Sequence, residues 1–93
     1  MIRTPDLSVF LDVVDEDPTR QKIVAMEELS ELIQAISKDL RGQPNRSNIA
    51  EEMADVYIML HEMEYLYDNK TIIRNKIYEK AKRLDERMKE KKI

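Results

Sequence analysis

Two pairs of acidic residues stand out in this 93-residue chain because each pair is spaced three apart in a segment rich in helix-forming residues. Glu28 and Glu31 form the first pair, within EELSEL, and Glu52 and Asp55 form the second, within EEMAD. Residues three apart on a helix are neighbours, so each pair can present two carboxylate oxygens to one ion. The sequence therefore predicts a divalent-metal site built between two helices.

Carboxylates gathered at one site restrict which metal can bind there. Four of them at a partly dry site would repel one another and be driven to protonate unless a cation compensates them. Ligation by oxygen alone favours Mg²⁺ or Mn²⁺ over zinc or iron. Di-iron carboxylate bundles need Glu-x-x-His pairs, and here Ile58 stands three residues before the single histidine, His61. We therefore expect Mg²⁺, with Mn²⁺ as an alternative.

The positions of the acids around their helices separate the four candidates. At about 100° per residue, Glu52 falls about 40° from Val56 in the apolar stripe of its helix, and Asp55 falls about 100° from it. Glu28 lies on the flank of the apolar arc of the first long helix, whereas Glu31 lies nearly opposite the centre of that arc. The angles favour Glu28, Glu52 and Asp55 as ligands, and spacing alone favours Glu31.

These acids are predicted to lie on helices. The chain has one glycine, three prolines and few aromatic residues, together with 38% charged residues, which favours an all-α protein. Asp17 followed by Pro18 is typical of a helix start, and Gly42 with Pro44 is typical of a helix end. We predict one helical domain over 1–93, with a short N-terminal segment and three main helices, over 1–17, 18–41, 48–67 and 71–91.

Each predicted main helix carries an apolar stripe with the spacing expected of a core-facing surface. The first stripe comprises Ile23, Met26, Leu29, Ile33, Ile36 and Leu40. The second comprises Ile49, Met53, Val56, Leu60 and Met63, and the third comprises Ile73, Ile77, Ala81, Leu84 and Met88. We expect Asn48 and Glu51 to form a capping box at the start of the second helix and Thr71 to cap the third.

A domain of this size has a thin core and usually needs a disulfide, a metal or a partner subunit. The chain has no cysteine, which excludes a disulfide and is compatible with a reducing compartment. No long apolar run or charged leader suggests membrane insertion or secretion, so we expect a cytoplasmic protein. We also predict a homodimer or homotetramer, in which helices from different subunits complete four-helix bundles.

Charge is unevenly distributed along the chain. The net charge of −3 gives no general attraction to nucleic acid. The segment 70–92, however, holds ten of the sixteen Lys and Arg residues, and Lys76, Lys80, Arg83 and Arg87 form one basic stripe. Such a stripe can hold phosphate oxygens, with Arg able to bind in a forked manner. Alternatively, these side chains lie on apolar surface and pair with neighbouring acids.

The acidic motifs also resemble those of a known family. EELSE at 27–31 and EMAD at 52–55, on two helices joined by a loop, are similar to the EExxE and ExxD motifs of MazG-like all-α nucleoside triphosphate pyrophosphohydrolases. The resemblance extends over about Arg20 to Met88. It implies hydrolysis of a nucleoside triphosphate to the monophosphate and pyrophosphate, with Mg²⁺ held by residues 28, 31, 52 and 55.

The resemblance also implies roles for the remaining candidates. The metal would neutralise phosphate charge and lower the pKa of a bound water, with Glu27 helping to take its proton or supporting the ligands. Lys76, Lys80 and Arg83 would bind the triphosphate. Two alternatives stay open: a metal-dependent enzyme acting on a dinucleotide or another phosphoanhydride, and a non-enzymatic helical interaction module whose acids only keep it in solution.

Overall fold

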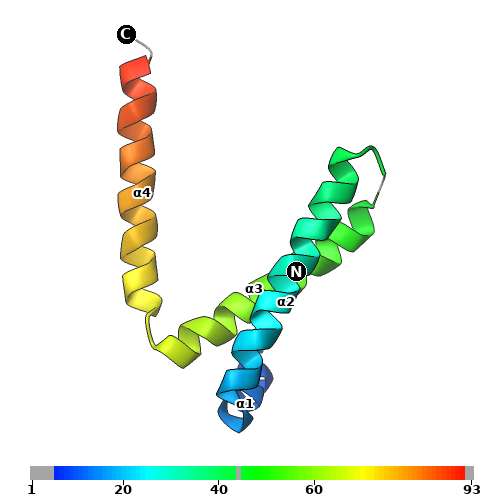
Figure 1. Cartoon of the computed structure of the whole chain (residues 1–93). Helices are drawn as coiled ribbons and strands as arrows, with labels where there is room; N and C mark the ends of the chain where they lie inside the picture. The colour runs from blue at the N-terminus through cyan, green and yellow to red at the C-terminus, as the bar shows by residue number, and fades with distance from the viewer. Residues whose placement is uncertain (1–5, 44, 92–93) are drawn as a thin grey trace.

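The computed structural model describes residues 6–43 and 45–91, which form four α-helices. These are α1 (Ser8–Glu16), α2 (Pro18–Leu40), α3 (Arg46–Tyr67) and α4 (Lys70–Lys91). The predicted all-α class is therefore confirmed. α1, α2 and α3 form one body, and α4 projects away from it at the end of α3 (Figure 1). Residues 1–5 of the predicted N-terminal segment, and Pro44 of the predicted helix end, lie outside the described residues.

Local chemistry determines both ends of α2. The carboxylate of Asp17 accepts a hydrogen bond of 3.1 Å from the backbone N–H of Arg20, and Pro18 occupies the first helical position. At the other end Gly42 adopts a left-handed conformation, with φ of 81°, and its N–H donates to the carbonyl of Asp39. These are the start and stop signals that the sequence indicated.

α3 and α4 begin earlier than the sequence predicted. The N–H of Ile49 donates to the carbonyl of Asn45, so the helix starts at Arg46, and Asn48 already lies within its first turn. The predicted capping box is therefore wrong. The side chain of Asn45 does not cap the helix but donates a bond of 3.0 Å to the carbonyl of Ala35 in α2. α4 likewise starts at Lys70, one residue before the predicted cap, residue 71.

The core lies where α2, α3 and α1 meet, and it is small. α2 and α3 form an antiparallel hairpin, and α1 packs against both of them. The buried apolar residues of the described chain are Val14 in α1, Ala25 and Ala35 in α2, and Val56 in α3. The two alanines allow the helices to approach closely, because a methyl group occupies little space between two backbones.

The predicted burial of the long apolar stripe on α2 is wrong for the single chain. Met26 and Ile33 are each 69% exposed, and Leu40 is 82% exposed. The physical reason is that α3 packs against the neighbouring face of α2, which carries the two buried alanines, and the stripe consequently faces outward. On α3 the residue Val56 is buried as expected, but Leu60 is 52% exposed. α4 has no buried residue at all.

None of the helices in the described part of the chain combines the length and apolar character that crossing a membrane requires.

Candidate metal centre

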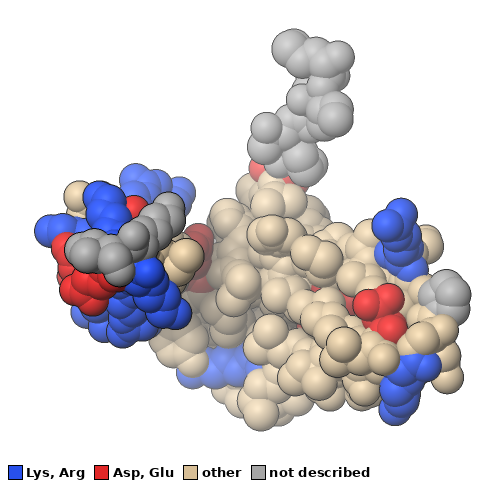
Figure 2. Space-filling view, turned by 90° about the horizontal axis from the view of Figure 1, so that it is seen from above, with Lys and Arg blue, Asp and Glu red and all other residues tan. Residues whose placement is uncertain are grey.

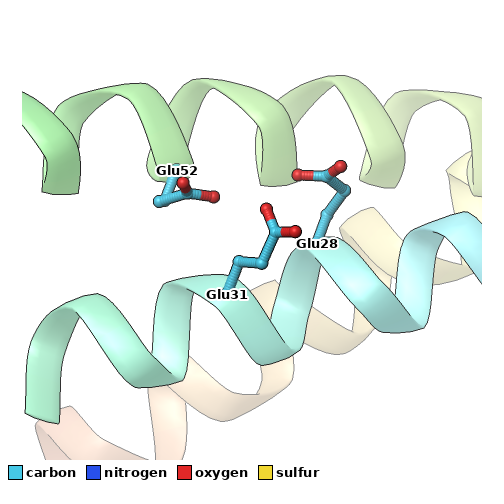
Figure 3. A group of neighbouring side chains, drawn as sticks. All are labelled: Glu28, Glu31 and Glu52. Carbon is cyan, nitrogen blue, oxygen red and sulfur yellow. The ribbon is translucent and has the colours of Figure 1, made fainter.

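The two acidic pairs meet in the space between α2 and α3. Glu28 and Glu31 project from α2 and Glu52 projects from α3, and their carboxylates converge (Figure 3). One oxygen from each of the three lies within 4.8 Å of the other two. That spacing allows all three to contact one cation. The predicted convergence of the acids from both helices is thus observed for these three residues.

The register of the helix pair explains why these acids meet. Gln21 in α2 is hydrogen-bonded to Glu62 in α3. Glu28 lies seven residues, or about two turns, after Gln21, and Asp55 lies seven residues before Glu62. In an antiparallel pair this equal spacing places Glu28 beside Asp55. Three residues later in α2 and three residues earlier in α3, Glu31 and residue 52 are likewise brought side by side.

Two of the acids carry oxygen atoms that are buried and unpartnered. Glu28, Glu52 and Asp55 are half-buried and Glu31 is exposed. The Oε2 atoms of Glu28 and Glu52 are shielded from solvent and have no hydrogen-bond partner. The ion pairs found among residues 6–43 and 45–91 both lie within α4, so none of them neutralises these carboxylates. Buried acceptors without a partner are costly, and a cation would satisfy both.

The electrostatics of the cluster point the same way. The pKa of Glu28 is raised to about 7, first by burial and then by the negative charges of Glu31, Asp55 and Glu52 together with a hydrogen bond to Asp55. The pKa of Glu52 is also raised, first by burial and then by its hydrogen bond with Glu31 and the charge of that residue. Without a cation, the cluster holds its negative charge unfavourably. A hard divalent cation with oxygen preference fits this set of donors.

The other predicted site residues lie at the edge of this cluster or away from it. Glu27 is exposed on α2, adjacent in sequence to Glu28 but outside the converging group. Lys76, Lys80 and Arg83 are all exposed on α4, and Lys76 lies 3.7 Å from Glu79. Because α4 extends away from the body, a single chain does not bring these three cations to the acidic cluster (Figure 1).

Glu62 is the residue of this region that the sequence reasoning missed. It is completely buried, Gln21 donates a bond of 2.6 Å from Nε2 to its Oε1, and its Oε2 has no partner. Its position could have identified it from the sequence, because Glu62 lies two turns after Asp55 and therefore on nearly the same face of α3. Tyr65, a little further along, donates a bond of 2.7 Å to Asp15 and joins α3 to α1.

Fold and site together define an all-α protein with a carboxylate cluster between two antiparallel helices. No family model matches the chain, and comparison with curated proteins and with solved structures likewise gives no match. The resemblance to the MazG-like family therefore rests on the two acidic motifs and their spacing, and it stays a prediction.

Proposed function

We propose that this chain is a Mg²⁺-dependent nucleoside triphosphate pyrophosphohydrolase that converts an NTP or dNTP to the monophosphate and pyrophosphate. Glu28, Glu31, Glu52 and Asp55 would hold the metal, with Mn²⁺ as a possible substitute. The observation that supports this proposal is the convergence of three carboxylates, two of which carry a buried oxygen without a partner. Asp55 adds a fourth carboxylate beside Glu28.

Each acid has a distinct place in this proposal. Mg²⁺ bound here would neutralise phosphate charge and activate a water for attack on the α-phosphorus. Glu28 and Glu52 would direct their buried oxygens at the cation, and the exposed Glu31 would bind on the solvent side, where a substrate must enter. Glu27, at the exposed edge, would accept the proton released by the attacking water or orient a neighbouring ligand.

The phosphate-binding side of the site is proposed to come from another subunit. Lys76, Lys80 and Arg83 would neutralise the triphosphate, but α4 carries them away from the acids of its own chain. A homodimer or homotetramer that completes four-helix bundles could bring them to a neighbouring copy. We place the activity in the cytoplasm, since a chain without cysteine suits a reducing compartment.

Pyrophosphate release from a panel of NTPs and dNTPs, with Mg²⁺, with Mn²⁺ and with chelator, tests the proposal. Glu52→Gln preserves shape and removes the charge, and we expect it to lower kcat by about 100-fold or more, as for loss of a group that stabilises the transition state. Glu51→Gln is the matched control, because it makes the same change at the adjacent, exposed residue. Full activity of Glu52→Gln would exclude the proposed site.

The large exposed apolar surface of α2, α3 and α4 favours one alternative, a helical protein-protein interaction module without catalytic activity. Absence of pyrophosphate release across the whole panel, with intact helical structure, would favour that module. Adding dinucleotides and other phosphoanhydrides to the panel distinguishes a metal-dependent enzyme with a different substrate.

A further inference from the structure

α4 is a 22-residue helix with almost no support from its own chain. None of its residues is buried, and Ile73 alone is half-buried. Its two ion pairs, Lys76–Glu79 at 3.7 Å and Lys89–Asp85 at 3.1 Å, are exposed and of the kind that contributes little to stability. Helices in proteins are stabilised mainly by packing of an apolar face. α4 therefore needs a surface that its own chain does not supply.

The apolar residues of α4 form a narrow seam that suits a helical partner. Ile77 is 62% exposed and Leu84 is 58% exposed, and Met88 lies one turn further on the same face. Together with Ile73 and Ala81 they recur every three or four residues, as in helices that pack along a single line. The seam is thus built to contact other helices rather than a flat or polar surface.

The body presents an uncovered apolar surface of matching kind. A shallow groove between α2 and α3 is lined by Leu32, Met53, Tyr57 and Leu60 among others. Tyr57 and Leu60 also line a second groove, which continues across the α3–α4 elbow to Ile73. The exposed stripe of α2 adds to this surface, and Figure 2 shows a broad uncharged area over the body. An apolar surface of this extent is typical of an interface.

Charge separates the two halves of the molecule. The described residues before α4 include fifteen acidic and five basic residues, a net charge of −10. α4 includes nine basic and four acidic residues, a net charge of +5. In Figure 2 the blue side chains accordingly gather around α4, which stands apart from the body. The α4 of one molecule and the body of another are therefore complementary in both charge and apolar character.

We propose that a second copy of this chain covers these surfaces, with the α4 seam of each copy lying along the apolar α2–α3 face of the other. Each chain carries both halves of the contact, as a two-fold symmetric dimer requires. With a helix about 33 Å long and about 10 Å wide, two such contacts would bury about 1,300 Å² in total, within the range of stable specific interfaces. The α4 seam and the α2–α3 face would thus be the contact surfaces of the expected homodimer, whether or not the chain has the proposed catalytic activity.

The first test compares the molar mass of two variants by light scattering and sedimentation at micromolar concentrations. Leu84→Glu places a charge in the seam, and we expect it to weaken the dimer by about 30-fold, as for a residue central to an interface. Asn75→Glu adds the same charge on the opposite, exposed side of α4 and should leave the dimer unchanged. A monomeric mass for the unmutated chain would overturn the proposal. A different protein would then be the candidate partner for the apolar α2–α3 face.

The second test uses the unmutated chain, so it does not depend on how the variants fold. Copies labelled with ¹⁴N and ¹⁵N are mixed, exchanged and joined by a carbodiimide, which links lysine amines to carboxylates. We expect mixed-isotope links between lysines of α4 and acids of α2 or α3. Mixed-isotope links confined to α4 with α4, or a Leu84→Glu dimer as tight as that of Asn75→Glu, would overturn the reciprocal arrangement.

Discussion

The side-chain amide of Gln21 in α2 donates a hydrogen bond of 2.6 Å to Oε1 of Glu62 in α3, and both side chains are buried. This contact sets the same antiparallel register that brings Glu28 beside Asp55 two turns further along. A pair without an apparent place in the predicted site is thus part of the framework that forms it.

Removal of the Gln21 amide is expected to destabilise the protein. Gln21→Leu leaves both oxygens of Glu62 buried without a donor, which costs about 1–3 kcal/mol of unfolding free energy. Gln34→Leu, also on α2, removes only an exposed contact of 3.4 Å to Ser30 and should change stability by less than about 0.5 kcal/mol. Urea denaturation at one fixed protein concentration measures both variants.

The same pair gives a stricter check through a double variant. Replacing both polar partners by apolar residues of similar size is nearly neutral, because no buried group is left unpaired. Gln21→Leu combined with Glu62→Leu should therefore recover most of the stability lost in Gln21→Leu. If the double variant were less stable than the single one, the burial of Glu62 would depend on an interaction other than its bond with Gln21.

The link between α3 and α1 is expected to contribute less. Tyr65→Phe removes the donor of the exposed 2.7 Å bond to Asp15 and should lower the free energy of unfolding by less than Gln21→Leu does. Tyr78→Phe, on the exposed surface of α4, is the control.

The bond to Asp15 also raises the pKa of Tyr65, so Asp15→Asn should lower that pKa, as followed by phenolate absorbance during an alkaline titration. An unchanged titration curve would contradict the contact.

The acidic cluster predicts a pH dependence of stability in metal-free protein. The pKa of Glu28 rises from its ordinary value of 4.5 to about 7 through burial and through the charges of Glu31, Asp55 and Glu52. The folded state therefore binds more protons than the unfolded state within this range, and stability falls as the pH rises from about 4.5 to about 7. Thermal unfolding in chelator should show this fall, and Glu28→Gln should reduce it.

Addition of Mg²⁺ is expected to reverse that loss. A cation that binds the ionised cluster stabilises the folded state by mass action, and its binding releases protons. The rise in Tm on adding Mg²⁺ should therefore be larger at pH 8 than at pH 5.5. It should be small at both pH values in Glu52→Gln. An equal rise in parent and variant would show that Mg²⁺ acts elsewhere on the chain.

Close approach of α2 and α3 at Ala35 gives a test of the core. Ala35 is 2% exposed, and Ala35→Leu would force extra methyl groups between the helices, at a cost of about 1–3 kcal/mol. Ala54→Leu, at an exposed position of α3, should change stability by less than about 0.5 kcal/mol. Similar effects of the two changes in thermal unfolding would show that α3 does not pack on this face of α2.

Features that depend on a few neighbouring residues could be predicted without the structure. Asp17 with Pro18 starts α2, and the left-handed Gly42 follows its end, because caps and turns act within one helical turn. The acidic pairs of the two helices could likewise be identified from a spacing of three residues. For the same reason the sequence predicted that Glu52 lies near the core, and the structure places it half-buried.

Which faces of the helices meet, by contrast, became clear only from the folded chain. The large apolar residues of α2 gave the stronger periodic signal, yet α3 packs on the face with Ala25 and Ala35, where two backbones can come close. That choice depends on the shape of the partner helix, which no local pattern contains. The same packing buries Glu62 against Gln21 and leaves Ile33 exposed. α4 extends from the body, so its basic residues lie far from the acids of α2 and α3.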